Sequence, residues 1–359
     1  MKYPPIHYHD YLKIDQLLSQ QKRRSEEMGN PAHDELLFIT VHQAYELWFK
    51  QILFEVDSIL EVFSAKNIPE QNMALASARL ERVISILKLI MGQIDVLETM
   101  TPLDFLEFRE YLYPASGFQS VQFRLIEIKL GLKEKDRLLY NENPFSKHLP
   151  ESHQKMVQEA IQQESLFGLI DKWLARTPFL QNKEFDFWSA YQKAVTEMFK
   201  ADRETVKANP QLTEETKKKN LEMIDASEKT FHATYSEAGY KKLQDEGHFH
   251  LSFKAFHGAL LIYLYRDQAI FHLPFKILSS LMDIDELLTQ WRYRHALMAH
   301  RMLGQKIGTG GSSGHAYLKA ATDKHKVFTD FFNLSTFLIP RSKVPPLPAS
   351  LQSKMNFNY

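Results

Sequence analysis

The chain has 359 residues, of which 44% are hydrophobic and 25% charged, and its 44 basic and 44 acidic side chains balance. This length suffices for one large domain or two modest ones. Zero net charge gives no general attraction for nucleic acid or an anionic membrane. The absence of cysteine excludes disulfides, thiolate ligands and cysteine nucleophiles. Because no apolar run approaches about 18 residues and the N-terminus lacks the core of a signal peptide, we expect a cytoplasmic protein that binds neither membrane nor nucleic acid.

The first eleven residues form an aromatic arm, followed by a predicted short helix at residues 11–24. Its aromatic side chains are Tyr3, His7, Tyr8, His9 and Tyr11. Such an arm either docks on another surface or anchors the terminus on its own chain. The sequence alone leaves both interpretations open.

The strongest helix signal spans residues 33–65, where apolar side chains cover nearly the whole circumference. Phe38, His42, Tyr45 and Phe49 lie on one stripe at steps of three and four. A histidine in such a stripe needs a partner or a function, so it is either a hydrogen-bonded core residue or a site residue. The chain has no Glu-x-x-His or His-Glu-x-x-His motif, which argues against a di-iron bundle or a zinc helix.

A single arginine interrupts an apolar stripe on the helix predicted at residues 104–112. Phe105, Arg109 and Leu112 share one face of this helix. An arginine there is costly unless it meets an anion, which is either an internal carboxylate or a bound ligand. Residues 114–117 then break the helical pattern.

The middle of the chain, residues 133–246, is rich in Lys, Glu and Gln. This composition favours a solvated helical subdomain over a basic docking patch. We therefore expect a core formed by residues 1–132 and 247–359, with residues 133–246 inserted as a smaller charged subdomain.

No segment shows a sustained alternation of period two, so the sequence predicts an all-α fold, a helical bundle. Further helices are predicted at residues 71–100, 121–130, 156–175, 185–199, 253–265, 273–282, 286–303 and 316–332. Asp283 and Asp285 are predicted to cap the start of the helix at residues 286–303. Gly304 is predicted to end it.

One face of the helix predicted at residues 286–303 carries Trp291, His295, Met298 and Met302 at steps of three or four. By spacing alone, His295 is either a packed core residue or an axial haem ligand with aromatic and thioether neighbours. His300 lies about 140° further round the helix, so both histidines cannot face one iron.

A glycine-rich loop follows at residues 308–314. Glycine lets main-chain N–H groups approach a bound group closely. A phosphate cradle is rejected because no Gly-Lys-Ser/Thr follows, and the dinucleotide fingerprint fails at Ser313. A flexible linker is the alternative.

Four segments closely resemble the tryptophan 2,3-dioxygenase family. They are the Tyr-x-x-Tyr-Leu motif at Tyr8, HDELLFITVHQAYELWFKQ, TPLDFLEFREYLYPASGFQSVQF, and WRYRHALMAHRMLG followed by GTGGSSGHAYL. The resemblance covers nearly the whole chain and is weakest in residues 133–246.

The resemblance implies a helical bundle that encloses haem b between His42 and His295. His295 would ligate the iron, and His42, on the distal side, would accept the indole N–H and orient the ring. Arg109 would pair with the substrate carboxylate, and Thr309 would hydrogen-bond the substrate ammonium or carboxylate. Phe38, Phe105 and Leu112 would form walls of the substrate pocket. Ser116 and Gly117 would lie near the edge of the haem, with Ser116 also near the substrate. Trp291 and Arg124 would contact the haem.

The family further implies cleavage of the indole C2–C3 bond of L-tryptophan by O₂ to give N-formylkynurenine, the first step of tryptophan breakdown through kynurenine. It also implies a homotetramer in which Tyr8 and Tyr11 reach a neighbouring subunit's active site. Two alternatives are a related haem dioxygenase acting on another indole, and a haem-free helical interaction protein. In the second, His42, Arg109 and His295 would be satisfied core residues.

Overall fold

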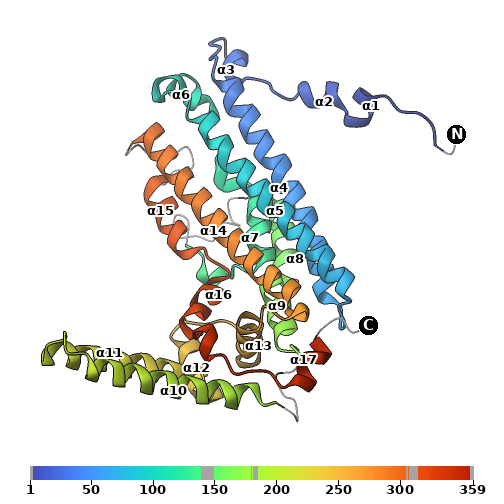
Figure 1. Cartoon of the computed structure of the whole chain (residues 1–359). Helices are drawn as coiled ribbons and strands as arrows, with labels where there is room; N and C mark the ends of the chain where they lie inside the picture. Colours follow the sequence, from blue (N-terminus) through green and yellow to red (C-terminus); the bar gives the residue numbers. More distant parts are fainter. Residues whose placement is uncertain are drawn as a thin grey trace. The chain divides into compact units, whose positions relative to one another are not determined.

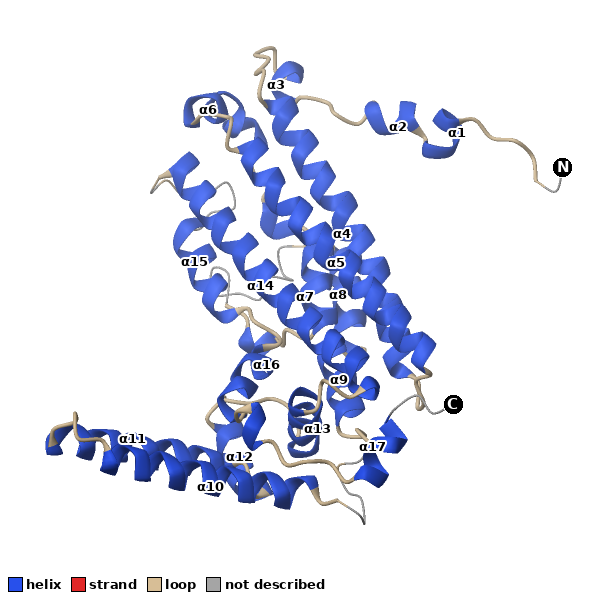
Figure 2. Cartoon of the chain, in the orientation of Figure 1, coloured by secondary structure: helices blue, strands red, loops and turns tan. Residues whose placement is uncertain are grey.

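The computed structural model describes residues 3–138, 149–178, 180, 185–304, 306 and 314–355. These residues form helices and loops without a strand, which confirms the predicted all-α fold (Figure 2). The α-helices are α1 (Tyr8–Leu12), α2 (Ile14–Leu18), α3 (Arg24–Glu27), α4 (Glu35–Ser64), α5 (Glu70–Leu97), α6 (Pro102–Arg109), α7 (Val121–Leu130), α8 (Glu151–Gln162), α9 (Leu166–Leu174), α10 (Phe187–Ala208), α11 (Glu214–Ala233), α12 (Glu237–Asp245), α13 (Phe253–Leu264), α14 (Ala269–Leu303), α15 (Gly314–Lys324), α16 (Thr329–Asn333) and α17 (Ala349–Met355).

The chain divides into two compact units. Unit 1 comprises Met1–Asp57, Arg82–Gln163 and Glu286–Lys326, and unit 2 comprises Ser58–Glu81, Glu164–Asp285 and Val327–Tyr359. The boundaries fall inside α4, α5 and α14, so each of these long helices contributes to both units. Of the expected insert, residues 133–163 belong to unit 1 and residues 164–246 to unit 2. The division into a core and an insert stays a prediction.

In unit 1, α4 and α5 lie side by side (Figure 1). The apolar stripe of α4 is buried at Val41, Tyr45 and Phe49, as expected for a helix that packs on more than one side. The Tyr45 hydroxyl donates a hydrogen bond of 2.8 Å to the Ile90 carbonyl of α5. None of the described helices has the length and hydropathy needed to cross a membrane.

Local capping fixes the ends of α6 and α7. Thr101 and Asp104 form a capping box at the start of α6, and Pro102 occupies its first turn. Ser120 accepts a backbone hydrogen bond at the start of α7, which ends at Gly131 with φ +133°. The 3₁₀ turns Glu110–Leu112 and Gly117–Gln119 connect the two helices, where the sequence predicts a break.

Helix α14 runs from Ala269 to Leu303, so the helix predicted at residues 273–282 and the one predicted at residues 286–303 are a single helix. Asp283 and Asp285 therefore lie inside the helix, and the prediction that they cap its start is wrong. The Asp285 carboxylate instead accepts hydrogen bonds of 3.0 Å from the backbone N–H groups of Val327 and Phe328. An aspartate before an apolar run is typical of a helix cap, but the Asp285 carboxylate binds the backbone of a segment that is distant in sequence. Gly304, at φ +59°, ends the helix as predicted.

Unit 2 has its own core, in which α13 packs closely on α9. A Cβ atom at Gly258 would lie 2.2 Å from the Leu174 carbonyl oxygen, so only glycine permits this approach. Tyr191 of α10 is fully buried and donates a hydrogen bond of 2.6 Å to the Phe337 carbonyl. A tyrosine side chain can be buried in a core when its hydroxyl group has a hydrogen-bond partner, as here.

Candidate functional site

Unit 1 contains a cavity of about 220 Å³ whose walls are mostly apolar. Cavities of this type, with a few convergent polar groups, are the usual setting of ligand sites. The lining residues are Phe38, His42, Leu97, Met100, Phe105, Ser116, Gly117, Phe118, Phe123, Arg124, Glu127, Trp291, Arg292, His295, Met298, Ala299, Met302, Leu303, Leu318, Ala321 and His325.

The cavity brings together most of the residues that sequence analysis singled out. Helix α4 contributes Phe38 and His42, the segment from α6 to α7 contributes Phe105, Ser116, Gly117 and Arg124, and α14 contributes Trp291, His295, Met298 and Met302. These segments are far apart in the chain, so their convergence is a result of the fold. It makes one site out of three separate motifs.

The orientation of His42 is fixed by its own helix. Its Nδ1 lies 2.7 Å from the Phe38 carbonyl oxygen, and only a protonated nitrogen can donate to a carbonyl. The tautomer with Nδ1–H therefore leaves Nε2 as a hydrogen-bond acceptor. Burial lowers the pKa of His42 despite the opposing effects of the Phe38 carbonyl and Glu46. The imidazole is accordingly neutral near pH 7.

His295 is a second neutral imidazole on the cavity wall. Burial, with a smaller effect of His42, lowers its pKa to about 4. The Trp291 ring stacks beside it with the ring centroids 5.3 Å apart and the planes 25° apart. Phe123 packs on Trp291 in turn, at 4.9 Å. A neutral, held imidazole with an available ring nitrogen is a suitable ligand for a transition-metal ion.

Aromatic rings form the wall next to His42. The Phe38 ring centroid lies 4.0 Å from that of His42 and 5.9 Å from that of Phe105. Phe108 closes the group, 5.5 Å from Phe38 and 5.4 Å from Phe105. Such offset and edge-on arrangements suit a flat aromatic ligand.

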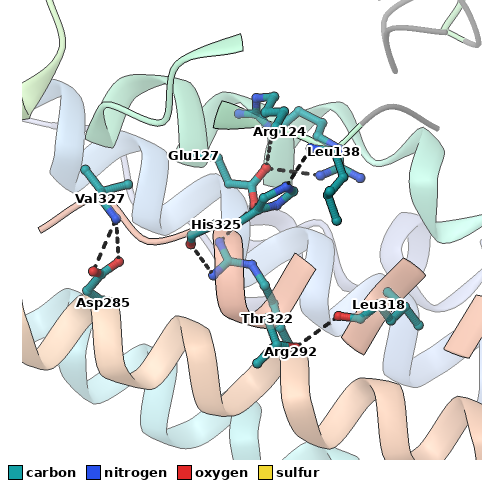
Figure 3. Close-up of polar contacts among 10 residues, drawn as sticks. Arg124, Glu127, Leu138, Asp285, Arg292, Leu318, Thr322, His325 and Val327 are labelled. Atoms are coloured by element: carbon teal, nitrogen blue, oxygen red, sulfur yellow. Dashed lines mark hydrogen bonds and ion pairs between the residues drawn. The ribbon is translucent and has the colours of Figure 1, made fainter. Parts of the chain in front are cut away.

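A buried ionic group forms another part of the wall, and we call it the arginine–glutamate cluster: Arg124, Glu127, Arg137, Arg292 and His325. Figure 3 labels Arg124, Glu127, Arg292 and His325 of this cluster. One carboxylate oxygen lies 3.1 Å from Arg124 and 2.5 Å from Arg137, and the other lies 2.9 Å from Arg292 and 3.6 Å from His325. Burial alone would raise the pKa of Glu127, but these neighbours hold it well below its ordinary value.

The predicted carboxylate partner lies outside the set of lining residues. Arg109 is half-buried, one turn beyond Phe105 on α6, and Leu112 follows in the adjacent 3₁₀ turn. Thr309 and most of the glycine-rich loop lie outside the described residues.

The aromatic arm makes no contribution to the cavity of its own chain. The predicted helix at residues 11–24 is divided, because Lys13 adopts a left-handed conformation with φ +54° between α1 and α2. Neither helix contains a buried residue. Tyr8 and Tyr11 are 69% and 70% exposed.

Sequence analysis missed the arginine–glutamate cluster, except for Arg124. Glu127 in the apolar run of α7 and Arg292 beside Trp291 are charges on otherwise buried faces, and this was a usable signal for each. Their pairing was not predictable, because the two residues are 165 positions apart.

Comparison with known proteins gives one family along nearly the whole chain. The family model described as tryptophan 2,3-dioxygenase matches residues 3–338. A tryptophan 2,3-dioxygenase of Bdellovibrio bacteriovorus is 61% identical over 359 residues, which is 100% of both chains. That of Alteromonas mediterranea is 45% identical over 353 residues, 98% of both chains. That of Xenopus tropicalis is 46% identical over 346 residues, 96% of this chain and 85% of the relative.

Proposed function

The chain belongs to the tryptophan 2,3-dioxygenase family and cleaves the indole C2–C3 bond of L-tryptophan with O₂ to give N-formylkynurenine, and we propose that it does so with haem b held by His295. This reaction begins tryptophan catabolism through kynurenine. The observation that carries the haem proposal is that two neutral histidines, His42 and His295, line one apolar cavity. Family membership argues against a haem-free interaction protein.

The residues of the cavity fit a haem, the cofactor on which this family depends. The neutral imidazole of His295 can ligate iron, and Trp291, Met298 and Met302 provide apolar surface beside it. The Nε–H of Arg292 is buried and has no hydrogen-bond partner among the described residues, so the wall retains a donor for an anionic group. When bound, the haem supplies the chemistry that makes O₂ reactive towards an indole.

The protein's contribution is to hold the indole ring at a fixed place. Phe38 and Phe105 would pack against its faces, and Nε2 of His42 would accept the indole N–H. No proton needs to leave the indole nitrogen for this role, because a neutral hydrogen bond already orients the ring. Both atoms of O₂ enter the product, so positioning and the exclusion of competing water are what these side chains provide.

Two further contacts would recognise the amino acid. Arg109 would form a charge-assisted pair with the carboxylate, and Thr309 would hydrogen-bond the ammonium or the carboxylate. A site that satisfies both charged ends rejects analogues that lack one of them. Indole and tryptamine should therefore be poor substrates.

We also propose that the enzyme is a homotetramer in which the arm of one subunit completes the site of another. The support is the exposure of the arm: α1 and α2 bury no residue on their own chain, while Tyr8 and Tyr11 present large amphipathic rings. Rings of this type are enriched in interfaces.

Replacing His295 with alanine tests the haem proposal. We expect the purified His295→Ala variant to take up no stoichiometric haem, seen as loss of the Soret band, and to regain a haem spectrum when imidazole is added. His300→Ala is the control, because His300 is exposed on the same helix. An unchanged spectrum and activity in His295→Ala would overturn the ligand assignment.

A further inference from the structure

We propose that Phe108, which is not among the residues that line the cavity, is a positioning residue of the indole pocket, the part of the cavity formed by Phe38, His42 and Phe105. Its ring holds the rings of Phe38 and Phe105 and, through Phe38, the ring of His42. This role rests on the proposed function, in which these three side chains contact the indole. Phe108 sets the geometry of the pocket without contacting the substrate.

Phe108 supports the wall of the pocket from the protein interior. Its side chain is 0% exposed, whereas Phe38 and Phe105 both line the cavity. A ring that borders a cavity has packing partners on one side only, so the side chains behind it set its orientation. Phe108 contacts both wall rings and is itself fully enclosed.

The contacts of Phe108 with the two wall rings are edge-on. Its ring centroid lies 5.5 Å from that of Phe38, with the planes at 62°, and 5.4 Å from that of Phe105, with the planes at 89°. The wall rings lie 5.9 Å apart, with their planes 31° apart. Edge-on pairs are favourable beyond the apolar area that they bury, and they depend on the angle between the rings. One buried ring therefore restricts the tilt of both wall rings.

Phe38 connects Phe108 to the imidazole of His42. The rings of Phe38 and His42 lie 4.0 Å apart, with their planes 31° apart, and the Phe38 carbonyl oxygen lies 2.7 Å from Nδ1. The hydrogen bond fixes one edge of the imidazole, and the packed Phe38 ring restricts its rotation about that bond. The direction in which Nε2 accepts a hydrogen bond therefore depends on the Phe38 ring, which Phe108 holds.

Phe108 also anchors the helix that carries the second wall ring. Helix α6 has eight residues, and its buried side chains are Phe105 and Phe108. A helix of this length depends on tertiary packing for its stability. Both rings contact Phe38 of α4, so the three-ring contact that docks α6 also shapes the indole pocket.

The test measures the preference for L-tryptophan over 1-methyl-L-tryptophan, which lacks the indole N–H, as the ratio of the two kcat/KM values in Phe108→Leu. Leucine keeps an apolar anchor for α6 but has no ring edge. Because both substrates are measured on one preparation, the ratio does not depend on the fraction of enzyme that is folded and active. We expect the ratio to fall by about twofold or more, and by no more than in His42→Ala, since Nε2 is less well directed at the indole N–H.

Two further variants separate positioning from a general loss of packing. Phe256→Leu on α13 is the matched control, since Phe256 is also 0% exposed and packs against the aromatic rings of Tyr240 and Phe249. It should keep the wild-type ratio, and its urea midpoint reports the loss of stability from the same substitution. Phe38→Leu should lower the ratio by itself. Adding Phe108→Leu to Phe38→Leu should cause no further fall, because Phe108 acts on His42 through Phe38.

The outcomes distinguish this role from the proposed function. An unchanged ratio in Phe108→Leu, with a lowered ratio in Phe38→Leu and His42→Ala, would overturn the role of Phe108 and leave the proposed function intact. Additive effects of Phe108→Leu and Phe38→Leu would also overturn it, because Phe108 would then act independently of Phe38. A wild-type ratio in both Phe38→Leu and His42→Ala would instead contradict the proposed indole contacts, and the role of Phe108 would fail with them.

Discussion

At the scale of single residues, the fold fixes both the protonation and the direction of His42. The carbonyl of Phe38, four positions earlier on α4, takes the Nδ1–H, and burial keeps the ring neutral by lowering its pKa. The Nδ1–H therefore bonds to a carbonyl rather than to a carboxylate, which leaves Nε2 as the acceptor. This arrangement suits orientation of an N–H donor better than proton abstraction.

Replacing His42 with alanine should lower kcat/KM for L-tryptophan by about two- to tenfold, because one neutral hydrogen bond contributes about 0.5–1.5 kcal/mol. The wild-type preference for L-tryptophan over 1-methyl-L-tryptophan, which lacks the indole N–H, should shrink in the variant. Thr40→Ala on the exposed side of α4 is the control. If His42→Ala discriminates against the methylated substrate as wild type does, His42 does not accept the indole N–H.

Replacing Arg109 with alanine should raise the apparent KM for L-tryptophan by about 10- to 100-fold, because a hydrogen bond to a charged group contributes about 1.5–3 kcal/mol. Steady-state kinetics measure this, with Glu107→Ala on the exposed side of the same helix as the control. An unchanged KM would place the carboxylate site elsewhere.

At the scale of elements, periodicity predicts the helices well where burial is one-sided or complete. Helix α7 has the predicted bounds, and α4 differs from its prediction by a few residues. The continuity of α14 through Asp283 and Asp285 and the break at Lys13 were not predicted, since both depend on contacts or backbone conformation that leave no local pattern. The same limit applies to the site: Phe38 and His42 share a stripe, whereas Glu127, Arg292 and His325 meet only after folding.

Helix α13 carries a histidine that should make the protein less stable in acid. His257 packs 3.6 Å from the Trp188 ring, centroid to centroid, and burial lowers its pKa to about 4. Between pH 6.5 and 4 the unfolded chain binds a proton that the folded chain does not, so stability falls as pH falls.

The His257→Gln variant should therefore lose less stability than wild type between pH 7 and pH 5, by about 2 kcal/mol. Urea unfolding at one fixed protein concentration measures the difference. His232→Gln on α11, where the side chain is half-exposed, should behave as wild type. Parallel pH profiles for wild type and His257→Gln would show that His257 titrates normally in the folded protein.

At the scale of the whole molecule, the proposed placement of the arm in a neighbouring subunit would make the active site a property of the assembly. A chain lacking residues 1–12 and a His295→Ala chain should each be inactive, for different reasons. Co-assembled from a denatured mixture, they should regain activity, because the arm of the His295→Ala chain can complete the haem site of the truncated chain. Mixed oligomers without activity would mean that the arm acts within its own subunit.

We propose that this chain holds haem in the cavity lined by His42 and His295 and uses it to cleave L-tryptophan. The most direct test of this proposal is a visible spectrum of the purified protein supplied with haem, reduced, and then mixed with L-tryptophan in air while N-formylkynurenine is measured. We predict a Soret band and accumulation of the product. Absence of haem uptake, or haem uptake without N-formylkynurenine, would contradict the claim.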